Sequence, residues 1–330
     1  MTTIATLDGP LDTADLGTVL MHEHVFNLTA EIQVVHPGFN GWDPDVEVPK
    51  ARGQLRAVKE AGIDTVVELS PIGLGRSLDL IRRAAHGSGL NLILATGLYT
   101  YDVLPRPWHF VGPGTLLDGE EPLDALMRAD LADGIEGSGV RAGILKCAID
   151  GAGLTEHVER VVRSVCRVHR ETGAPVCVHT SAPHERGRDA LRVLAEEEID
   201  PGRVMLAHCG DSTDLDYLEE LAGSGALLGM DRFGLDVLLG FEDRVSTVVA
   251  MCERGHADQM ILSQDAMCFT DWFAPGLREQ MAPNWHFLHV VQDVVPELLR
   301  RGVTQDQVDL MLRGNPRAFF ERSYRRAPDL

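Results

Sequence analysis

Five short apolar runs in this chain lead into side chains that commonly bind metal ions. The first run, 16–21, is typical of a strand and leads into His22 and His24, which share one face because alternate residues of a strand do so. Two neutral imidazoles about 6–7 Å apart along a strand can bind one divalent cation. The later runs 142–145, 175–178, 204–207 and 260–262 lead into Lys146, His179, His208 and Asp265.

The joint placement of these residues carries more weight than any one of them. Alone, each histidine would be an ordinary packed side chain, Asp265 a helix cap, and Lys146 a surface lysine whose stem lies along apolar surface. All of them, however, mark the carboxyl ends of strand-like runs, and in parallel barrels those ends form the active-site rim. The pattern therefore predicts a metal site distributed over one rim.

The order of apolar runs along the chain predicts the fold. Runs at 65–69, 92–96 and 226–230 bring the expected strands to eight, and segments with helical spacing lie between them. Continuous apolar strands alternating with amphipathic helices favour a parallel sheet covered by helices, and eight such units predict a (β/α)8 TIM barrel. An open doubly wound sheet is disfavoured, because no Gly-x-Gly-x-x-Gly follows the first strand and no Walker-type lysine is present. The expected helices include 54–61, 77–85, 156–171 and 214–222.

Both ends of the chain look like additions to such a barrel. Residues 3–15 contain the turn signal Asp8-Gly9-Pro10 and predict a short N-terminal hairpin, and residues 303–322 predict closing C-terminal helices. A chain of 330 residues could be two average domains or one large barrel. Since no linker, low-complexity tract or internal repeat interrupts the pattern, we expect residues 1–330 to form a single domain.

Composition excludes several classes of protein. The net charge of −20 disfavours nucleic acid and anionic membrane surfaces as partners. No stretch approaches the roughly 18–20 apolar residues of a membrane helix, and the N-terminus lacks the layout of a secretory signal. The six cysteines are separate, with no Cys-x-x-Cys pair, which suits the reducing cytoplasm.

Lys146 is chemically distinctive because only three of the 30 basic residues are lysines. A lysine kept at the end of an apolar strand indicates a need for a primary amine. An ammonium repels a dication, but an amine can react with carbon dioxide to give a carbamate whose two oxygens can bridge two metals. Arginine is always charged and cannot replace it in this role.

The motif His22-Glu23-His24, followed by Lys146, His179, His208 and Asp265, resembles the phosphotriesterase branch of the amidohydrolase superfamily. The resemblance covers nearly the whole chain. It is closest to the phosphotriesterase-like lactonases, whose motifs are similar to 95–99, 143–147, 208–214, 229–234 and 262–265.

The resemblance implies a pair of divalent metal ions about 3.5–4 Å apart. A carbamate on Lys146 and a hydroxide would bridge them, and the hydroxide would attack the lactone carbonyl while the exposed ion polarises its oxygen. Asp265 would take the hydroxide's proton and pass it to the leaving alkoxide. Zinc is expected, with cobalt, manganese or iron as alternatives, because all ligands are nitrogen or oxygen. The implied ligands are His22, His24 and Asp265 for the buried ion and His179 and His208 for the exposed ion.

The resemblance also assigns residues that are not ligands. Tyr99 would lie close to the bridging water, and Arg232 favours a lactonase because true phosphotriesterases carry a histidine there in a proton relay. The apolar segment 266–273 would form a loop that fits an acyl chain or a hydrophobic ring substituent, although packing or a dimer contact is an equal alternative. Gln264 departs from the family pattern, which has histidine at this position.

These features lead to one main hypothesis with alternatives. The chain would be a binuclear metal-dependent lactonase, acting on N-acyl-homoserine lactones or other γ- or δ-lactones, with incidental hydrolysis of organophosphate esters. A dedicated phosphotriesterase (aryldialkylphosphatase) or another amidohydrolase, such as a deaminase, is the alternative; mononuclear deaminases lack the bridging lysine. A barrel that binds without catalysis is disfavoured by the retention of all six ligands. The resemblance further implies a homodimer.

Overall fold

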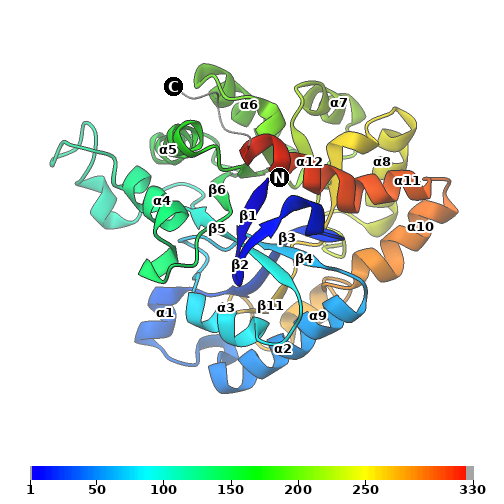
Figure 1. Cartoon of the computed structure of the whole chain (residues 1–330), viewed down its shortest axis with the longest axis horizontal. Coiled ribbons are helices and arrows are strands. Elements are labelled where there is room, and N and C mark those ends of the chain that lie inside the picture. Colours follow the sequence, from blue (N-terminus) through cyan, green and yellow to red (C-terminus); the bar gives the residue numbers. More distant parts are fainter. Residues whose placement is uncertain (1, 325–330) are drawn as a thin grey trace.

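The computed structural model, which describes residues 2–324, alternates strands and helices along most of the chain (Figure 1). The strands are β1 (Thr3–Thr6), β2 (Gly9–Asp12), β3 (Val19–Asn27), β4 (Thr65–Glu68), β5 (Asn91–Gly97), β6 (Ile144–Ile149), β7 (Val176–Thr180), β8 (Val204–Ala207), β9 (Leu227–Met230), β10 (Met260–Leu262) and β11 (Met267–Thr270). The helices are α1 (Ala30–Val35), α2 (Pro44–Glu60), α3 (Leu78–Ala85), α4 (Pro122–Ala132), α5 (Glu156–Thr172), α6 (Arg186–Glu196), α7 (Leu215–Gly223), α8 (Phe241–Glu253), α9 (Leu277–Met281), α10 (Val295–Arg300), α11 (Gln305–Asp309) and α12 (Asn315–Tyr324).

The parallel strands form one curled sheet in the order β10-β9-β8-β7-β6-β5-β4-β3-β11. Strands β3 to β9 each pair in parallel with the next strand along the chain, and helices surround the sheet (Figure 1). This is the TIM barrel that the sequence predicts, and each of the eight expected strands is present.

The structure corrects the sequence analysis at three places. The helix expected over 54–61 is the end of α2, which begins at Pro44. The expected loop over 266–273 is wrong for β11, which pairs with β3 so that Met267 lies beside His24. The first barrel strand begins at Val19 rather than at residue 16 and continues to Asn27, so that both histidines of the first motif lie within it. Strand β11 follows β10 after only four residues with no helix between them, so it departs from the alternation of strands and helices on which the prediction relied. Polar ligands hide the continuation of β3.

The barrel closes between β10 and β3 through the segment 263–266. The Asp265 N–H donates to the His22 carbonyl oxygen (3.0 Å), and the His22 N–H donates to the Ser263 hydroxyl (3.1 Å). The buried carboxylate of Glu23 accepts hydrogen bonds from the Ser263 hydroxyl (2.7 Å) and from two backbone N–H groups of the segment (3.0 and 2.8 Å). The Glu23 side chain thus replaces part of the regular strand ladder at this seam.

The N-terminal end of the barrel is filled with apolar side chains. Met21, Ile93 and Ile144 are fully buried in one cluster with Ile4 of the hairpin and Phe320 of α12. Figure 1 shows the hairpin over the middle of this end, with α12 beside it, which confirms the predicted hairpin and closing helices. The side chains predicted to bind metal therefore lie at the opposite rim of the barrel. Among residues 2–324, no helix has both the length and the apolar character needed to span a bilayer.

Gly97, the last residue of β5, provides a test of this packing. Its φ of +134° suits glycine, and a Cβ atom there would lie 1.9 Å from the carbonyl oxygen of Lys146 on the neighbouring strand. We expect Gly97→Ala to lower the free energy of unfolding by about 3 kcal/mol or more, through backbone strain and the clash. Urea titration followed by circular dichroism measures this loss. Gly223→Ala in α7, where the space is open, is the control and should change stability by less than about 1 kcal/mol.

Candidate metal centre

The carboxyl ends of five strands bring the predicted ligands together at one rim. His22 and His24 of β3 both turn Nε2 toward Oδ1 of Asp265, at 3.5 and 3.0 Å. His179 of β7 and His208, directly after β8, meet with Nδ1 and Nε2 only 2.8 Å apart. These side chains are all but inaccessible to solvent, so that the structure brings together every histidine that the sequence analysis selected.

Lys146 lies among these rings. Its Nζ atom is 3.4 Å from Nε2 of His22 and 3.3 Å from Sγ of Cys177, and only 1 % of the residue is exposed. Within residues 2–324, no carboxylate lies within ion-pair distance of Nζ. An ammonium buried in this way is costly, and the position suits an amine that is converted to an anion.

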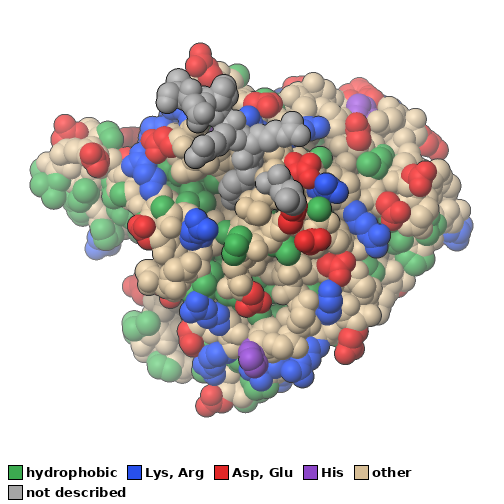
Figure 2. All heavy atoms as spheres, in the orientation of Figure 1, with side chains coloured by type: hydrophobic (Ala, Val, Ile, Leu, Met, Phe, Trp, Pro, Cys, Tyr) green, Lys and Arg blue, Asp and Glu red, His purple; other side chains and the backbone are tan. Residues whose placement is uncertain are grey.

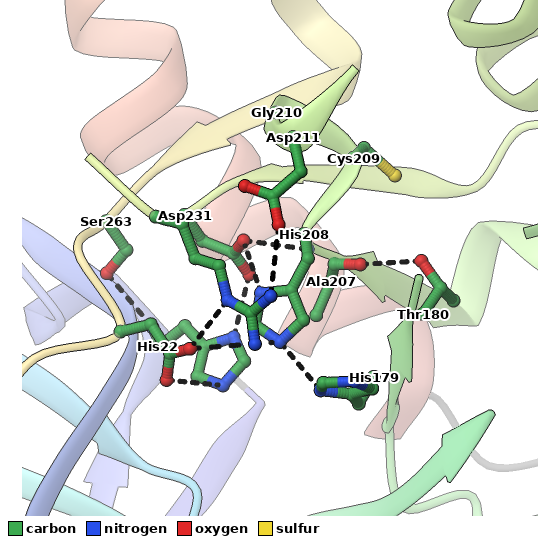
Figure 3. A network of polar contacts seen from close by, with 12 residues as sticks. His22, His179, Thr180, Ala207, His208, Cys209, Gly210, Asp211, Asp231 and Ser263 are labelled. Carbon is green, nitrogen blue, oxygen red and sulfur yellow. Dashed lines mark hydrogen bonds and ion pairs between the residues drawn. The ribbon is translucent and has the colours of Figure 1, made fainter. Parts of the chain in front are cut away.

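Asp231, the residue after β9, holds two of the histidines from outside. Its Oδ2 accepts a hydrogen bond from Nδ1 of His22 (2.7 Å), and its Oδ1 accepts from Nδ1 (3.0 Å) and from the backbone N–H (2.7 Å) of His208 (Figure 3). The backbone contact also stabilises His208 in its left-handed conformation (φ 66°). This single buried carboxylate therefore fixes one ring from each side of the centre.

The other two histidines have outer partners of their own. Nδ1 of His24 is 2.8 Å from the Ser70 hydroxyl, and Nε2 of His179 is 2.5 Å from Oδ2 of Asp150. Every ring of the cluster thus uses one nitrogen for an outer oxygen and points the other inward. A carboxylate or hydroxyl on the outer nitrogen is the usual support of a histidine that binds a metal.

Three of the four histidines are held neutral. Burial, with a smaller contribution from Lys146, lowers the pKa of His22 to about 4, and burial also lowers that of His179 to about 4. Burial and the nearby Arg232 guanidinium hold the pKa of His208 well below its usual range. If the outer nitrogens of His179 and His208 carry the protons that their carboxylate partners accept, two lone pairs face each other across 2.8 Å. Such an arrangement repels unless a cation lies between them.

The donor set therefore fits divalent metal ions. The group His22–His24–Asp265 has ligand atoms close enough to surround an ion, whereas in the overlapping group His22–His208–Asp231 the carboxylate already accepts hydrogen bonds from the outer nitrogens of both rings. The donors are imidazole nitrogens and ionised carboxylates, which suit zinc and similar ions. Although burial alone would raise the pKa of Asp265, the surrounding histidines and Arg232 hold it well below its usual range.

Asp265 lies in a turn that is held by hydrogen bonds from neighbouring side chains, and not in a strand. The residue has a φ of +53°, and the Trp285 indole N–H donates to the carbonyl oxygens of Gln264 (2.9 Å) and Asp265 (3.0 Å). The Gln264 amide donates to Glu23 (2.8 Å) and accepts from the Val290 N–H (2.9 Å). Gln264, which departs from the family pattern, thus supports the turn that presents Asp265.

Tyr99 and Arg232 both reach the centre. The Tyr99 hydroxyl is 3.2 Å from Nδ1 of His179 and 2.7 Å from the Tyr101 hydroxyl. Burial holds the pKa of Tyr99 well above its usual range, so that the phenol stays protonated. The Arg232 guanidinium donates to Asp265 and to Asp211, both at 3.0 Å.

A cavity of about 230 Å³ opens over the centre. From the segment after Asp265, the side chains of Met267, Trp272 and Phe273 line it, whereas Phe269 packs against Trp42 instead. The other apolar wall comes from a segment that sequence reasoning missed, through Leu235, Val237 and Leu238.

Comparisons with known proteins agree with this geometry. The model of the phosphotriesterase family matches residues 2–320. The chain belongs to the phosphotriesterase family. The structure of a phosphotriesterase from Mycobacterium tuberculosis is 51% identical in sequence and superposes with a TM-score of 0.95. The match covers 97% of this chain and 98% of the other. An aryldialkylphosphatase from Saccharolobus solfataricus is 30% identical over 94% of this chain and 96% of its own length.

Lactonases are also among the similar structures. A variant of a phosphotriesterase-like lactonase from Deinococcus radiodurans is 30% identical, with a TM-score of 0.87 over 96% of this chain and 99% of its own. These relatives show that this phosphotriesterase-family protein is a metal-dependent hydrolase. They also confirm the resemblance on which the sequence analysis relied.

Two supporting carboxylates of this phosphotriesterase-family site were not selected from sequence. Asp231 directly precedes Arg232, and Asp150 directly follows β6, the strand that carries Lys146. Both positions follow strand ends, which is the same signal that marked the ligands. The signal is insufficient by itself, because it does not distinguish a residue that faces the metals from one that faces the back of a ring.

Loss of the Asp231 carboxylate should weaken both halves of the centre. We expect Asp231→Asn to lower the affinity for metal by about 10–100-fold, because the amide keeps only one acceptor oxygen for the two rings of His22 and His208 and that oxygen is uncharged. Metal content after dialysis against buffers of fixed free zinc measures the change. Asp216→Asn, on a fully exposed side chain of α7, removes the same charge and should leave zinc binding unaltered.

Proposed function

We propose that the protein is a lactonase that uses two divalent cations, most suitably zinc. His22, His24 and Asp265 would hold the buried cation, and His179 and His208 the more exposed one. The single observation that carries this proposal is the inward convergence of four imidazoles, each supported from behind by an oxygen. Bound cations would supply a water nucleophile at neutral pH and polarise the lactone carbonyl.

Lys146 would join the two cations as a carbamate. In that reaction Nζ forms a bond to the carbon of carbon dioxide and one proton is released to solvent. Its burial, the adjacent His22 nitrogen and the lack of a carboxylate partner within residues 2–324 support this assignment. The product is an anion, which removes the cost of a buried ammonium beside dications.

Asp265 would carry the proton of the reaction. Its Oδ1 faces the two β3 histidines, whereas Oδ2 accepts from Arg232 and faces away from them. Oδ2 would accept the proton of the attacking water and deliver it to the alkoxide that leaves as the ring opens. Tyr99, a protonated phenol at the cavity wall, would donate a hydrogen bond to the substrate or the water.

Arg232 supports a lactonase rather than a dedicated triesterase. Its guanidinium remains charged, so it cannot take a proton onward from Asp265 as a histidine relay would. A leaving alkoxide in the same opened molecule remains near Oδ2 and can receive the proton directly. The name of the Saccharolobus relative favours an aryldialkylphosphatase as the second candidate.

The cavity supports a substrate with an apolar substituent. Its walls combine Trp272, Phe273 and Met281 with the aliphatic side chains of Leu235, Val237 and Leu238, which would bind an acyl chain such as that of an N-acyl-homoserine lactone. Ring size and chain length would depend on these walls rather than on the metal ligands.

We further propose that residues 1–330 act as one domain in the cytoplasm and as a homodimer. The six cysteines are free and buried, which suits a reducing compartment. Hydrophobic side chains gather on the arm that projects between β5 and α4 (Figure 2), where Phe110, Leu116 and Leu117 are exposed. Such a surface is a candidate for contact with a second copy, and sedimentation of the purified protein would detect the dimer.

A panel of substrates tests the activity. The zinc-loaded protein should hydrolyse γ- or δ-lactones with kcat/KM at least about tenfold above that for aryl dialkyl phosphotriesters, a difference of about 1.4 kcal/mol in transition-state stabilisation. Titration of released acid for lactones and absorbance of the released phenol for triesters give the two values. The reverse ratio would favour the aryldialkylphosphatase.

Replacement of Lys146 tests the carbamate. Lys146→Ala should lose at least about 100-fold in activity with a parallel loss of metal, and short carboxylic acids should restore part of both by supplying the missing oxygens. Lys50→Ala, which removes an exposed amine of α2, is the matched control. A fully active Lys146→Ala protein that needs no added acid would be incompatible with a carbamate.

A further inference from the structure

Asp150 occupies an unusual place beside the centre. It is the first residue after β6, and its Oδ2 lies 2.5 Å from Nε2 of His179, while Oδ1 accepts from the Gly151 N–H. Its side chain is 32 % exposed, whereas that of Asp231 is fully buried. Arg186 of α6 donates to the Gly151 carbonyl oxygen (2.8 Å) and so anchors this turn to the barrel wall.

His179 is oriented differently from the other histidines of the cluster. His22, His24 and His208 point Nε2 inward, but His179 points Nδ1 inward, toward His208. For Nδ1 to present a lone pair, the ring proton must be on Nε2, the atom that faces Asp150.

We propose that Asp150 is a positioning residue that sets the tautomer and orientation of His179 and thereby the affinity of the more exposed metal site. The inference rests on the two-cation centre of the proposed function. The two outer carboxylates would then support different numbers of histidines. Asp231 contacts one histidine of each site, whereas Asp150 contacts His179 alone among the four.

Asp150 would act through His179 and not on the substrate. Among the described residues that line the cavity, His179 is present but Asp150 is not. The carboxylate faces the back of the ring, and the substrate would meet the front. Loss of Asp150 should therefore change metal binding while leaving KM for the lactone close to its original value once the metal is saturating.

Stepwise removal of zinc from the full-length holoenzyme tests this inference. Wild type, Asp150→Asn and Asp102→Asn would each be dialysed against chelator buffers of decreasing free zinc, and bound zinc per chain would be counted. Asp102 is the matched control, because it is an exposed aspartate of the same rim that does not contact a histidine of the cluster. Asparagine has nearly the same shape as aspartate, and a urea titration of each protein verifies that it is folded.

We expect Asp150→Asn to release one of its two zinc ions at about 10–100-fold higher free zinc than wild type, with the second ion held as before. Asp102→Asn should follow wild type. Excess zinc should restore kcat/KM in Asp150→Asn, which a general loss of structure would not allow. In NMR spectra of the zinc-loaded protein, the Nε2 proton of His179 should exchange with solvent faster in this variant.

Other outcomes would overturn the inference. Release of both ions by Asp150→Asn at the wild-type zinc concentrations would show that Asp150 does not support the site, and equal weakening of both ions would contradict its restriction to one site. A wild-type chain that binds fewer than two zinc ions would instead remove the two-cation centre of the proposed function. The wild-type and variant measurements therefore separate the two failures.

Discussion

Closure of the sheet between β10 and β3 is the constraint on which the candidate centre depends. The first and last ligands in the sequence, His22 and Asp265, meet only because the segment 263–266 returns to β3. The Glu23 carboxylate accepts three hydrogen bonds from this segment's Ser263 hydroxyl and backbone, and a fourth from the Gln264 amide. Glu23, which lies between the ligands His22 and His24 in the sequence, thus supports the placement of Asp265. That third ligand lies more than 200 positions away along the chain.

The centre is built in layers of decreasing burial. The inward nitrogens are surrounded by side chains that are almost fully buried, and Asp231 behind them is inaccessible to solvent. Asp150 and the cavity walls lie at the rim, where side chains from several loops meet. A barrel permits this gradient, because strand interiors are rigid while the loops after them vary independently. Metal binding and substrate preference can therefore depend on different segments of one rim.

Most of the fold was predictable from the sequence, because each barrel strand is a continuous apolar run and each major helix has an amphipathic period. The ligands were predictable because they follow or end such runs. The strand β11 was missed because it follows β10 directly, where the alternation of strands and helices predicts a loop and then a helix. Asp231 and Asp150 were missed because sequence places a residue at a strand end but does not show whether its side chain faces the front or the back of an imidazole. The wall formed by 235–238 has no periodic signal at all.

The same arrangement that prepares the centre for metal makes the metal-free fold costly. With the outer nitrogens protonated, the inward lone pairs of His179 and His208 face each other at 2.8 Å, and Lys146 is buried without a carboxylate within ion-pair distance in the part of the chain described. Protonation of an imidazole would relieve the repulsion, but burial disfavours it, as the lowered pKa values show. Cations relieve the repulsion between lone pairs directly, and a ligand that binds only the folded chain stabilises it in proportion to the logarithm of its concentration over Kd. Because the folded chain already holds the site in place, the free-energy cost of assembling the site falls on folding and not on metal binding. The free energy of folding is therefore coupled to the supply of metal.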